Sequence, residues 1–229
     1  MLHGYGPALL GGLWTTLSVA ALSLAVSCVF GLMGAAAKLS ASRTARVLAG
    51  AYTTLIRGLP DLVLMLLIFY GGQIALNALV ARQGWDYIDV PPYAAGVLTL
   101  GFIYGAYLTE TFRGAILAVP RGQVEAARAF GMRPAQVWFR IVLPQMVRHA
   151  IPGFTNNWLI MVKATALVSI IGLDDLVHRA NLAAAATREP FTFFMLIACV
   201  YLTVTTVSLA MLAWLNRRFS LGVREVRLS

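Results

Sequence analysis

Long apolar segments are the feature that most limits how this 229-residue chain can fold. A helix needs about 20 mainly apolar residues to cross the hydrocarbon core of a bilayer, where only helices and closed barrels satisfy every backbone group. Five segments reach or approach this length: Leu9–Ala37, Leu55–Val80, Ala94–Val119, Phe154–Ile171 and Phe191–Leu215. The sequence therefore predicts an all-α membrane protein with five transmembrane helices, in which residues 1–229 form a single transmembrane domain.

The composition agrees with a membrane protein and argues against soluble classes. Hydrophobic residues make up 59% of the chain and charged residues only 12%, which is about half the charged share of a soluble domain. The net charge of +9 would suit nucleic-acid binding, but the basic residues lie in the gaps between apolar segments, so no nucleic-acid partner is expected. The cysteines Cys28 and Cys199 lie inside apolar segments, and no metal site is expected.

The orientation of the chain is predicted from its Lys and Arg residues, because short cytoplasmic loops carry an excess of them. Fourteen basic residues fall on one side of the predicted membrane: Lys38, Arg43, Arg46, Arg57, Arg113, Arg121, Arg128, Arg133, Arg140, Arg148, Arg217, Arg218, Arg224 and Arg227. The other side holds Arg82, Arg179 and Arg188 together with Asp86, Asp89, Asp174, Asp175 and Glu189. The N-terminus is therefore predicted outside and the C-terminus inside.

The connection between the third and fourth apolar segments contains the most specific motif of the chain, within residues 121–144. Val124–Phe130 is rich in alanine and predicts a short helix, and Gly131 permits a turn with positive φ at little steric cost. Pro134 is suited to the first turn of a second short helix, which Pro144 is expected to end. The predicted product is a helix-turn-helix on the cytoplasmic surface. An amphipathic loop that only anchors the spans is the alternative.

The spacing of this motif resembles that of a known family. The pattern is E-A-A, three residues, G, nine residues and I-x-L-P, carried by Glu125, Ala126, Ala127, Gly131, Ile141, Leu143 and Pro144. It resembles the EAA loop of binding-protein-dependent ABC importer permeases. The resemblance implies a type I importer permease fold, in which this loop forms a coupling helix that docks on a cytoplasmic ATPase. It also implies that Glu125 and its neighbours contact the ATPase.

Three further stretches resemble the polar amino-acid subfamily of these permeases. They are R-G-L-P-D at 57–61, the third apolar segment around G-A-Y at 105–107 with Glu110 and R-G-A at 113–115, and K-A-T-A-L at 163–167. The last stretch has Ala166 where the subfamily usually has serine. The resemblance implies a Q-type permease subunit for basic amino acids, namely histidine, lysine, arginine or ornithine. Another polar amino acid, such as glutamine or glutamate, is the alternative substrate.

The resemblance also implies partners that supply what the chain lacks. The sequence has no G-x-x-x-x-G-K-[ST] phosphate-binding loop, so the chain is expected to be no ATPase and to bind no cofactor itself. ATP and Mg²⁺ would bind to two copies of a cytoplasmic ABC ATPase. The other implied partners are a paralogous M-type permease subunit, a periplasmic amino-acid-binding protein and the lipid of a bacterial inner membrane. A homodimer of permease subunits remains open beside the heterodimer.

Two other function classes are less compatible with the sequence. An intramembrane hydrolase needs paired catalytic residues at matching depth, and no catalytic residues are predicted in the apolar segments. A transporter that acts alone would be expected to have more spans or an internal repeat. Trp14, Trp85 and Trp214 near segment ends fit aromatic belts, while Gly101 and Gly105 predict a close helix contact.

Charged residues inside apolar segments are costly in lipid and are therefore candidates for function. Arg57, Asp61, Arg113 and Lys163 are predicted either to hold helices together or to serve transport. A cationic substrate side chain needs carboxylates. The candidates are Glu110, Asp174 and Asp175, which are predicted to pass the substrate inward. For Asp174 and Asp175, a solvated outer loop that meets the binding protein is the alternative.

Overall fold

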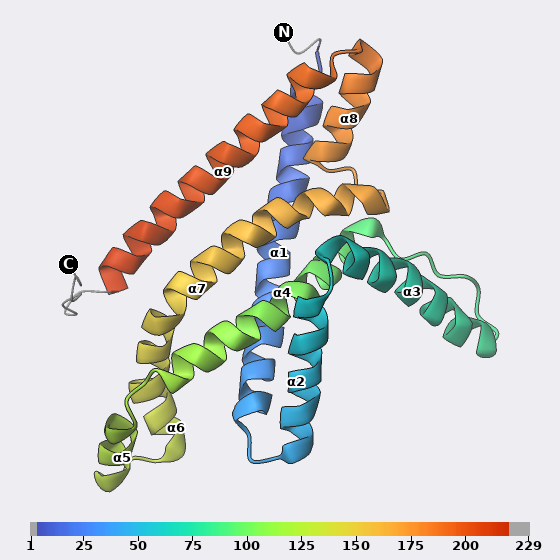
Figure 1. The fold of residues 1–229 in the computed structure, drawn as a ribbon. Helices are drawn as coiled ribbons and strands as arrows, with labels where there is room; N and C mark the ends of the chain where they lie inside the picture. The colour runs from blue at the N-terminus through green and yellow to red at the C-terminus, as the bar shows by residue number, and fades with distance from the viewer. Residues whose placement is uncertain (1–3, 220–229) are drawn as a thin grey trace.

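The computed structural model describes residues 4–219, with side chains described as far as Trp214, and within this range the chain is all-helical. Helix α1 (Gly6–Leu39) has 34 residues and is therefore about 51 Å long. Its central partner is α4 (Pro92–Leu117), which crosses it near the middle of the molecule (Figure 1). The side chains of Arg217 and Arg218, and all of Arg224 and Arg227, lie outside the described residues.

Small residues allow α1 and α4 to approach each other closely. A Cβ added to Gly101 would lie 2.4 Å from Val26 Cγ1, and one added to Gly105 would lie 2.5 Å from Phe30 Cβ. No side chain fits at either position without movement of α1. The predicted close contact at Gly101 and Gly105 is confirmed. Small residues at the interface of two membrane helices allow the two backbones to approach each other closely.

The segment predicted as one span over Leu55–Val80 is broken into two helices, α2 (Arg43–Gly58) and α3 (Asp61–Arg82). Leu59 has φ −115° and ψ 149°, because the ring of Pro60 disfavours the helical conformation in the preceding residue. Figure 1 shows that α3 leaves the end of α2 at an angle and extends away from the other helices. Apolar content alone did not reveal this break.

The fourth predicted segment, Phe154–Ile171, is part of a longer helical stretch that runs from Pro134 to Ile171. This stretch combines α6 (Pro134–Val137), a π-helical turn η1 (Trp138–Val142), α7 (Leu143–Ala164) and a 3₁₀ helix η2 (Thr165–Ile171).

The prediction that Pro144 ends a short helix is therefore wrong. The wider π turn comes directly before α7, with Leu143 N–H donating to Trp138 O. Pro144 consequently falls in the first turn of α7, where its missing N–H costs little.

The remaining helices are α5 (Arg121–Ala129), α8 (Leu176–Thr187) and α9 (Pro190–Phe219). Helix α8 packs on the start of α1, and α9 runs down the side of the molecule opposite α3 (Figure 1). Within the described residues, four helical stretches are long and apolar enough to cross a membrane: Gly6–Leu39, Asp61–Arg82, Pro134–Ile171 and Pro190–Trp214. Helix α4 is long enough but is not among them, since it carries Glu110, Arg113 and several hydroxyl side chains.

Candidate functional site

The loop between α4 and α7 has the turn that its sequence predicts. Gly131 has φ +78°, so the prediction of a positive φ is confirmed. Met132 N–H donates to Ala127 O at 3.1 Å and Gly131 N–H donates to Arg128 O at 2.9 Å, which ends α5 in a glycine-dependent helix cap. Gln136 Oε1 then accepts from Arg133 N–H at 2.9 Å and caps α6. The two helices are thus joined by a rigid elbow.

The residues of the E-A-A…G…I-x-L-P motif divide between the inside and the surface of this loop. Ala127 is buried with Val119, Val137 and Val142, and Ile141 packs against the same cluster. Leu143 belongs to a neighbouring cluster under α7. The exposed members are Glu125, Ala126, Gly131 and Pro144. The apolar members build the loop, whereas Glu125 and Ala126 are available to a partner.

The outer surface of the loop is aromatic and basic. Phe130 is 88% exposed, although burial of a phenyl ring is worth roughly 2 kcal/mol. Arg128 and Arg133, close to Phe130 in the sequence, are also exposed, as is Arg140 in η1. Among the described residues, none forms an ion pair with Glu125. An exposed ring among arginines suits a protein partner with an apolar pocket and an acidic rim.

Glu110 on α4 and Lys38 on α1 form an ion pair, and Lys38 extends the contact to α2. The Oε1 atom of Glu110 accepts from Lys38 Nζ on α1, and its Oε2 atom accepts from Arg113 Nε at 3.0 Å. Lys38 Nζ also donates to Thr53 Oγ1 on α2 at 2.6 Å. The Lys38 and Glu110 side chains are only 17% and 22% exposed. Both carboxylate oxygens of Glu110 are therefore occupied within the chain.

The charged residues at the break between α2 and α3 also bind α4. The Arg57 guanidinium lies over the ring of Tyr107, 5.4 Å from its centroid. Asp61 Oδ2 accepts from the Tyr104 hydroxyl at 2.9 Å. These contacts support the structural interpretation of Arg57 and Asp61, because each places a charge on an aromatic partner.

Asp174 forms an exposed clamp at the other end of the molecule. Arg179 donates to both of its carboxylate oxygens, at 2.9 and 2.7 Å, and also donates to Ala8 O at 2.7 Å. The hydrogen bonds from Arg179 hold the pKa of Asp174 below its usual range. The clamp ties the start of α8 to the start of α1.

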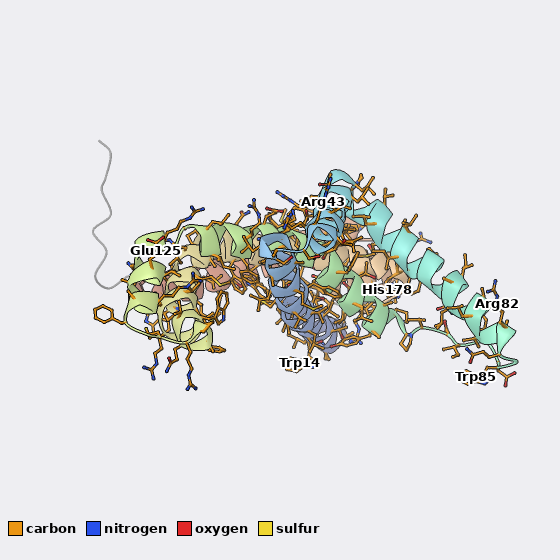
Figure 2. The ribbon with its side chains drawn as sticks, turned by 90° about the horizontal axis from the view of Figure 1, so that it is seen from below. Trp14, Arg43, Arg82, Trp85, Glu125 and His178 are labelled. Atoms are coloured by element: carbon orange, nitrogen blue, oxygen red, sulfur yellow. The ribbon has the colours of Figure 1, made fainter. Side chains whose placement is uncertain are left out.

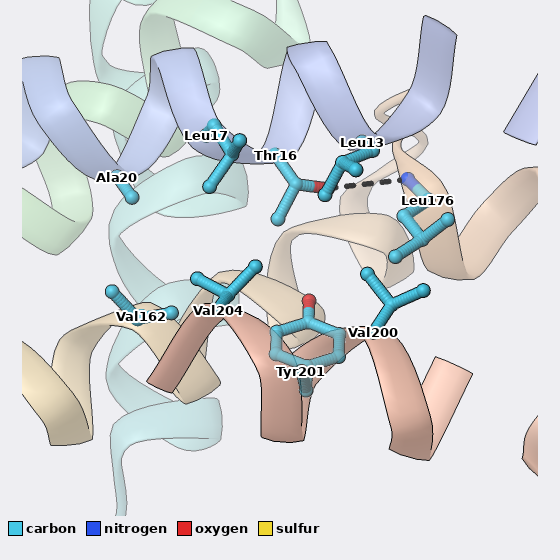
Figure 3. Close-up of a pocket in the computed structure, with 9 residues that line it drawn as sticks. All are labelled: Leu13, Thr16, Leu17, Ala20, Val162, Leu176, Val200, Tyr201 and Val204. Atoms are coloured by element: carbon cyan, nitrogen blue, oxygen red, sulfur yellow. Dashed lines mark hydrogen bonds between the residues drawn. The ribbon is translucent and has the colours of Figure 1, made fainter. Parts of the chain in front are cut away.

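Asp175 is buried, with 0% of its surface exposed. Its Oδ1 accepts from His178 N–H at 2.8 Å and caps α8, while its Oδ2 has no hydrogen-bond partner among the described residues. Burial raises the pKa of Asp175 to about 6. Next to it, Leu176 N–H donates to Thr16 Oγ1 at 3.2 Å, beside a small apolar pocket between α1 and α9 (Figure 3).

The three predicted substrate carboxylates do not lie together. Glu110 binds Lys38, whereas Arg179 of the Asp174–Arg179 pair binds Ala8. Ala8 and Lys38 are 30 residues apart on α1, which corresponds to about 45 Å.

Lys163 lies apart from both of these places. It lines a groove of about 440 Å³ between α7 and α9, together with Leu159, Ala198, Tyr201, Leu202, Thr205 and Leu209, and no described residue forms an ion pair with it.

The sequence did not identify Lys38 as the partner of Glu110, or Thr53 as the second partner of Lys38. A lysine at the end of a long apolar helix is normally assigned to the membrane surface. The pairing depends on the crossing of α1 and α4, which no local pattern reports. The sequence contains one weak signal for a special role of Lys38: no Lys, Arg, Asp or Glu occurs in the 37 residues before it.

Comparison with protein families gives a match to one family model over most of the chain. Residues 27–221 match the model described as binding-protein-dependent transport system inner membrane component. The matched range includes α2 to α9 and the complete loop between α4 and α7.

Several curated proteins are similar over most or all of the chain. The histidine/lysine/arginine/ornithine transport system permease protein HisQ of Salmonella typhimurium is 52% identical over 228 residues, which cover 100% of both chains. The nopaline transport system permease protein NocQ of Agrobacterium fabrum is 40% identical and covers 97% of this chain and 95% of its own. The arginine ABC transporter permease protein ArtQ of Haemophilus influenzae is 40% identical and covers 77% of this chain and 78% of its own.

Solved structures have the same helical arrangement. A chain from the crystal structure of an amino acid ABC transporter with histidines superposes with a TM-score of 0.79 at 32% identity, over 93% of this chain and 95% of that chain. A chain of the MetNI methionine ABC transporter in an inward-facing conformation superposes with a TM-score of 0.74 at 19% identity, over 96% and 99%. The second likeness concerns the fold alone.

Proposed function

Because the chain belongs to the family of binding-protein-dependent transport system inner membrane components, we propose that it is a permease subunit of an ABC importer for histidine, lysine, arginine and ornithine. The observation that carries this proposal is the 52% identity over the complete chain with a permease whose name states these substrates. The alternative is a permease for another polar amino acid, such as glutamine or glutamate. The chain itself would form half of the pathway and leave ATP hydrolysis to a separate subunit.

The proposed topology has five crossings, with the N-terminus outside and the C-terminus inside. The crossings are α1, the α2–α3 pair, α4, α7 together with η2, and α9. Helix α4 has 26 residues and is about 39 Å long, which exceeds the roughly 30 Å of a hydrocarbon core. Its charged side chains are paired and its apolar side chains are largely buried in the chain, so a modest hydropathy is compatible with a crossing.

The proposed coupling site is the surface of the loop between α4 and α7. Glu125 and Ala126 would contact a cytoplasmic ATPase, with Gly131 setting the turn and Ile141, Leu143, Pro144 and Ala127 supporting it. The rigid elbow supports this role, because a movement of the ATPase would then pass directly into α4 and α7. Two ATPase copies would hold ATP and Mg²⁺, and a paralogous permease would complete the pathway. A second copy of this chain is the alternative to that paralogue.

The proposed substrate contacts are Glu110, Asp174 and Asp175. In the conformation described, Glu110 is bound to Lys38 and Arg113, and Asp174 is bound to Arg179. A cationic substrate side chain would therefore have to displace a cation of the protein at each place. Such an exchange suits alternating access, in which a ligand shifts the equilibrium only through different affinities for the two states.

Uptake by the reconstituted transporter tests the function. The permease, its partner permease, the ATPase and the binding protein are placed in and around proteoliposomes, and entry of labelled arginine is followed. We expect uptake that needs internal ATP and is inhibited by excess histidine or lysine. Inhibition by glutamine or glutamate instead would favour the alternative substrate class. Uptake that continues without ATP would contradict an ABC importer.

The coupling loop is tested by two glycine variants of equal size. Gly131→Val places a β-branched residue at φ +78°, where such residues are strained by about 1–3 kcal/mol. Gly122→Val is the matched control, because Gly122 lies in the same loop with no atom within 4 Å of an added Cβ. We expect Gly131→Val to lose co-purifying ATPase in mild detergent and Gly122→Val to retain it. Equal retention by both would contradict coupling through this elbow.

A further inference from the structure

The loop between α3 and α4, residues 83–91, is held against α3 by two side-chain amides of that helix. Asn77 Nδ2 donates to Ile88 O at 2.9 Å, and Ile88 N–H donates to Asn77 Oδ1 at 2.8 Å. Gln73 Oε1 accepts from Val90 N–H at 2.9 Å, while Gln73 Nε2 donates to Ile88 O at 2.5 Å. The two amides pair with the loop as a neighbouring strand would. The loop backbone is therefore ordered before any partner binds.

This ordered loop, called the aromatic loop below, presents large side chains to its surroundings. Trp85 is 64% exposed and Tyr87 is 71% exposed, and Ile88 is exposed beside them. Gln73 Nε2 donates to the Tyr87 hydroxyl at 3.1 Å, so that ring is held in position. Exposed Trp and Tyr side chains on a rigid backbone are typical binding anchors, because little conformational entropy is lost when they are covered.

The charges of the aromatic loop indicate whether lipid or a protein covers its exposed aromatic side chains. Asp86 and Asp89 are exposed, and no described residue forms an ion pair with either. They form an acidic site on a chain whose net charge is +9. Anionic headgroups attract Lys and Arg and repel carboxylates. The pattern of aromatics with acids therefore suits a protein surface with an apolar pocket and a basic rim.

The aromatic loop lies at the far end of the molecule from the coupling loop. Figure 2 shows Trp85 and Glu125 at opposite ends. The aromatic loop precedes Pro92, the first residue of α4, and the coupling loop follows Leu117, the last. The 26 residues between them correspond to about 39 Å. If the coupling loop faces the ATPase, the aromatic loop faces the opposite compartment, from which a soluble binding protein approaches.

We propose that the aromatic loop is a docking surface for the soluble binding protein, with Trp85 and Tyr87 as apolar anchors and Asp86 and Asp89 as partners of Lys and Arg residues on that protein. The proposal rests on the proposed function, since a soluble binding protein is the partner of a binding-protein-dependent importer. Gln73 and Asn77 act as positioning residues that hold the loop ready for contact.

The experiment uses the complete transporter in phosphatidylcholine nanodiscs and in nanodiscs that contain phosphatidylglycerol. ATPase stimulation is measured against the concentration of substrate-loaded binding protein. We expect Trp85→Ala, and the double variant Asp86→Lys with Asp89→Lys, to raise the half-maximal concentration about tenfold or more. Basal and maximal rates stay unchanged in both lipids. Trp14→Ala is the matched control, because Trp14 is an exposed tryptophan on α1 without acidic neighbours.

The outcomes separate this inference from the proposed function. Half-maximal concentrations equal to wild type in both variants would overturn the docking surface while leaving the importer intact. An effect of Trp85→Ala on thermal stability that depends on phosphatidylglycerol, with unchanged half-maximal concentration, would assign the loop to the lipid interface. Absence of any stimulation in the wild-type complex would overturn the proposed function and this inference with it.

Discussion

At the scale of single residues, the carboxylates of this chain differ more in environment than in sequence. Asp174 and Asp175 are neighbours, yet Asp174 is exposed and paired with Arg179, while Asp175 is buried and its Oδ2 has no hydrogen-bond partner in the described part of the chain. The pKa of Asp174 is lowered by its hydrogen bonds to Arg179, and the pKa of Asp175 is raised to about 6 by burial. The two residues therefore have opposite effects on stability as the pH changes.

Asp175→Asn should make the protein more stable at neutral and alkaline pH. The folded state holds the Asp175 proton up to about pH 6, whereas the unfolded chain releases it near its ordinary pKa of 3.8. Stability is thus lost as the pH rises through this window, by at most about 3 kcal/mol at 1.36 kcal/mol per pKa unit. Asparagine keeps the oxygen that caps α8 and carries no charge.

The measurement is thermal unfolding of the detergent-solubilised complex across the pH range from about 4 to 8. We expect the stability gain of Asp175→Asn to be largest near the alkaline end and to disappear near the acid end. Asp174→Asn is the control of opposite sign, because a carboxylate with a lowered pKa stabilises the fold at high pH. A stability gain for Asp175→Asn that is independent of pH would contradict the prediction that ionisation of the buried Asp175 carboxyl destabilises the fold.

At the scale of helices, the Lys38–Glu110 ion pair connects α1 to α4, and Thr53 connects α2 to the same lysine. These helices also meet through glycine contacts, so the pair lies in a tightly packed region. Because both side chains are mostly buried, removal of one partner leaves a desolvated charge. Charge-assisted hydrogen bonds of this kind are worth roughly 1.5–3 kcal/mol.

Lys38→Glu should destabilise the protein by about 1.5–3 kcal/mol, because it places two carboxylates together. The exchanged pair, Lys38→Glu with Glu110→Lys, should recover part of this loss, and the new lysine beside Arg113 prevents full recovery. The loss is measured as the shift in thermal unfolding of the purified complex. Arg43→Glu, at an exposed position without an ion-pair partner among the described residues, should have little effect. If the exchanged pair is no better than the single variant, the two helices are not held by this contact.

At the scale of the whole molecule, two functional surfaces are separated by the length of α4. The coupling loop follows its C-terminus and the aromatic loop precedes its N-terminus. Helices α3 and α9 leave most of their apolar surface uncovered on two sides of the chain (Figure 1). Such surfaces suit lipid or a second permease subunit, which agrees with a protein that works only as part of a complex.

Cysteine accessibility should confirm that α4 crosses the membrane. Tyr87→Cys and Arg133→Cys are introduced into a chain whose Cys28 and Cys199 are replaced by alanine. We expect a membrane-impermeant maleimide to label Tyr87→Cys from the outside, and Arg133→Cys only after the membrane is opened. Both positions are exposed, so burial does not limit labelling. Labelling of both from one side would contradict the five-crossing topology.

The sequence by itself determined the class of this protein, the loop that carries its motif and the positive φ of Gly131. These features depend on local hydropathy and backbone sterics, which are set by residues that are close together in the sequence. The break before Pro60 also has a local cause, in the steric effect of its ring on Leu59, although apolar content alone did not show it. Only the structure showed that Pro144 does not end a helix.

The tertiary structure also decided the partners of the charges. Glu110 binds Lys38 from 72 positions away, and Asp175 is buried although Asp174 is not. The reason is physical: ion pairs and burial depend on how helices cross, and the crossing depends on small residues such as Gly101 and Gly105 that meet bulky side chains of another helix. No local pattern in a single sequence shows which residues of two distant helices come into contact.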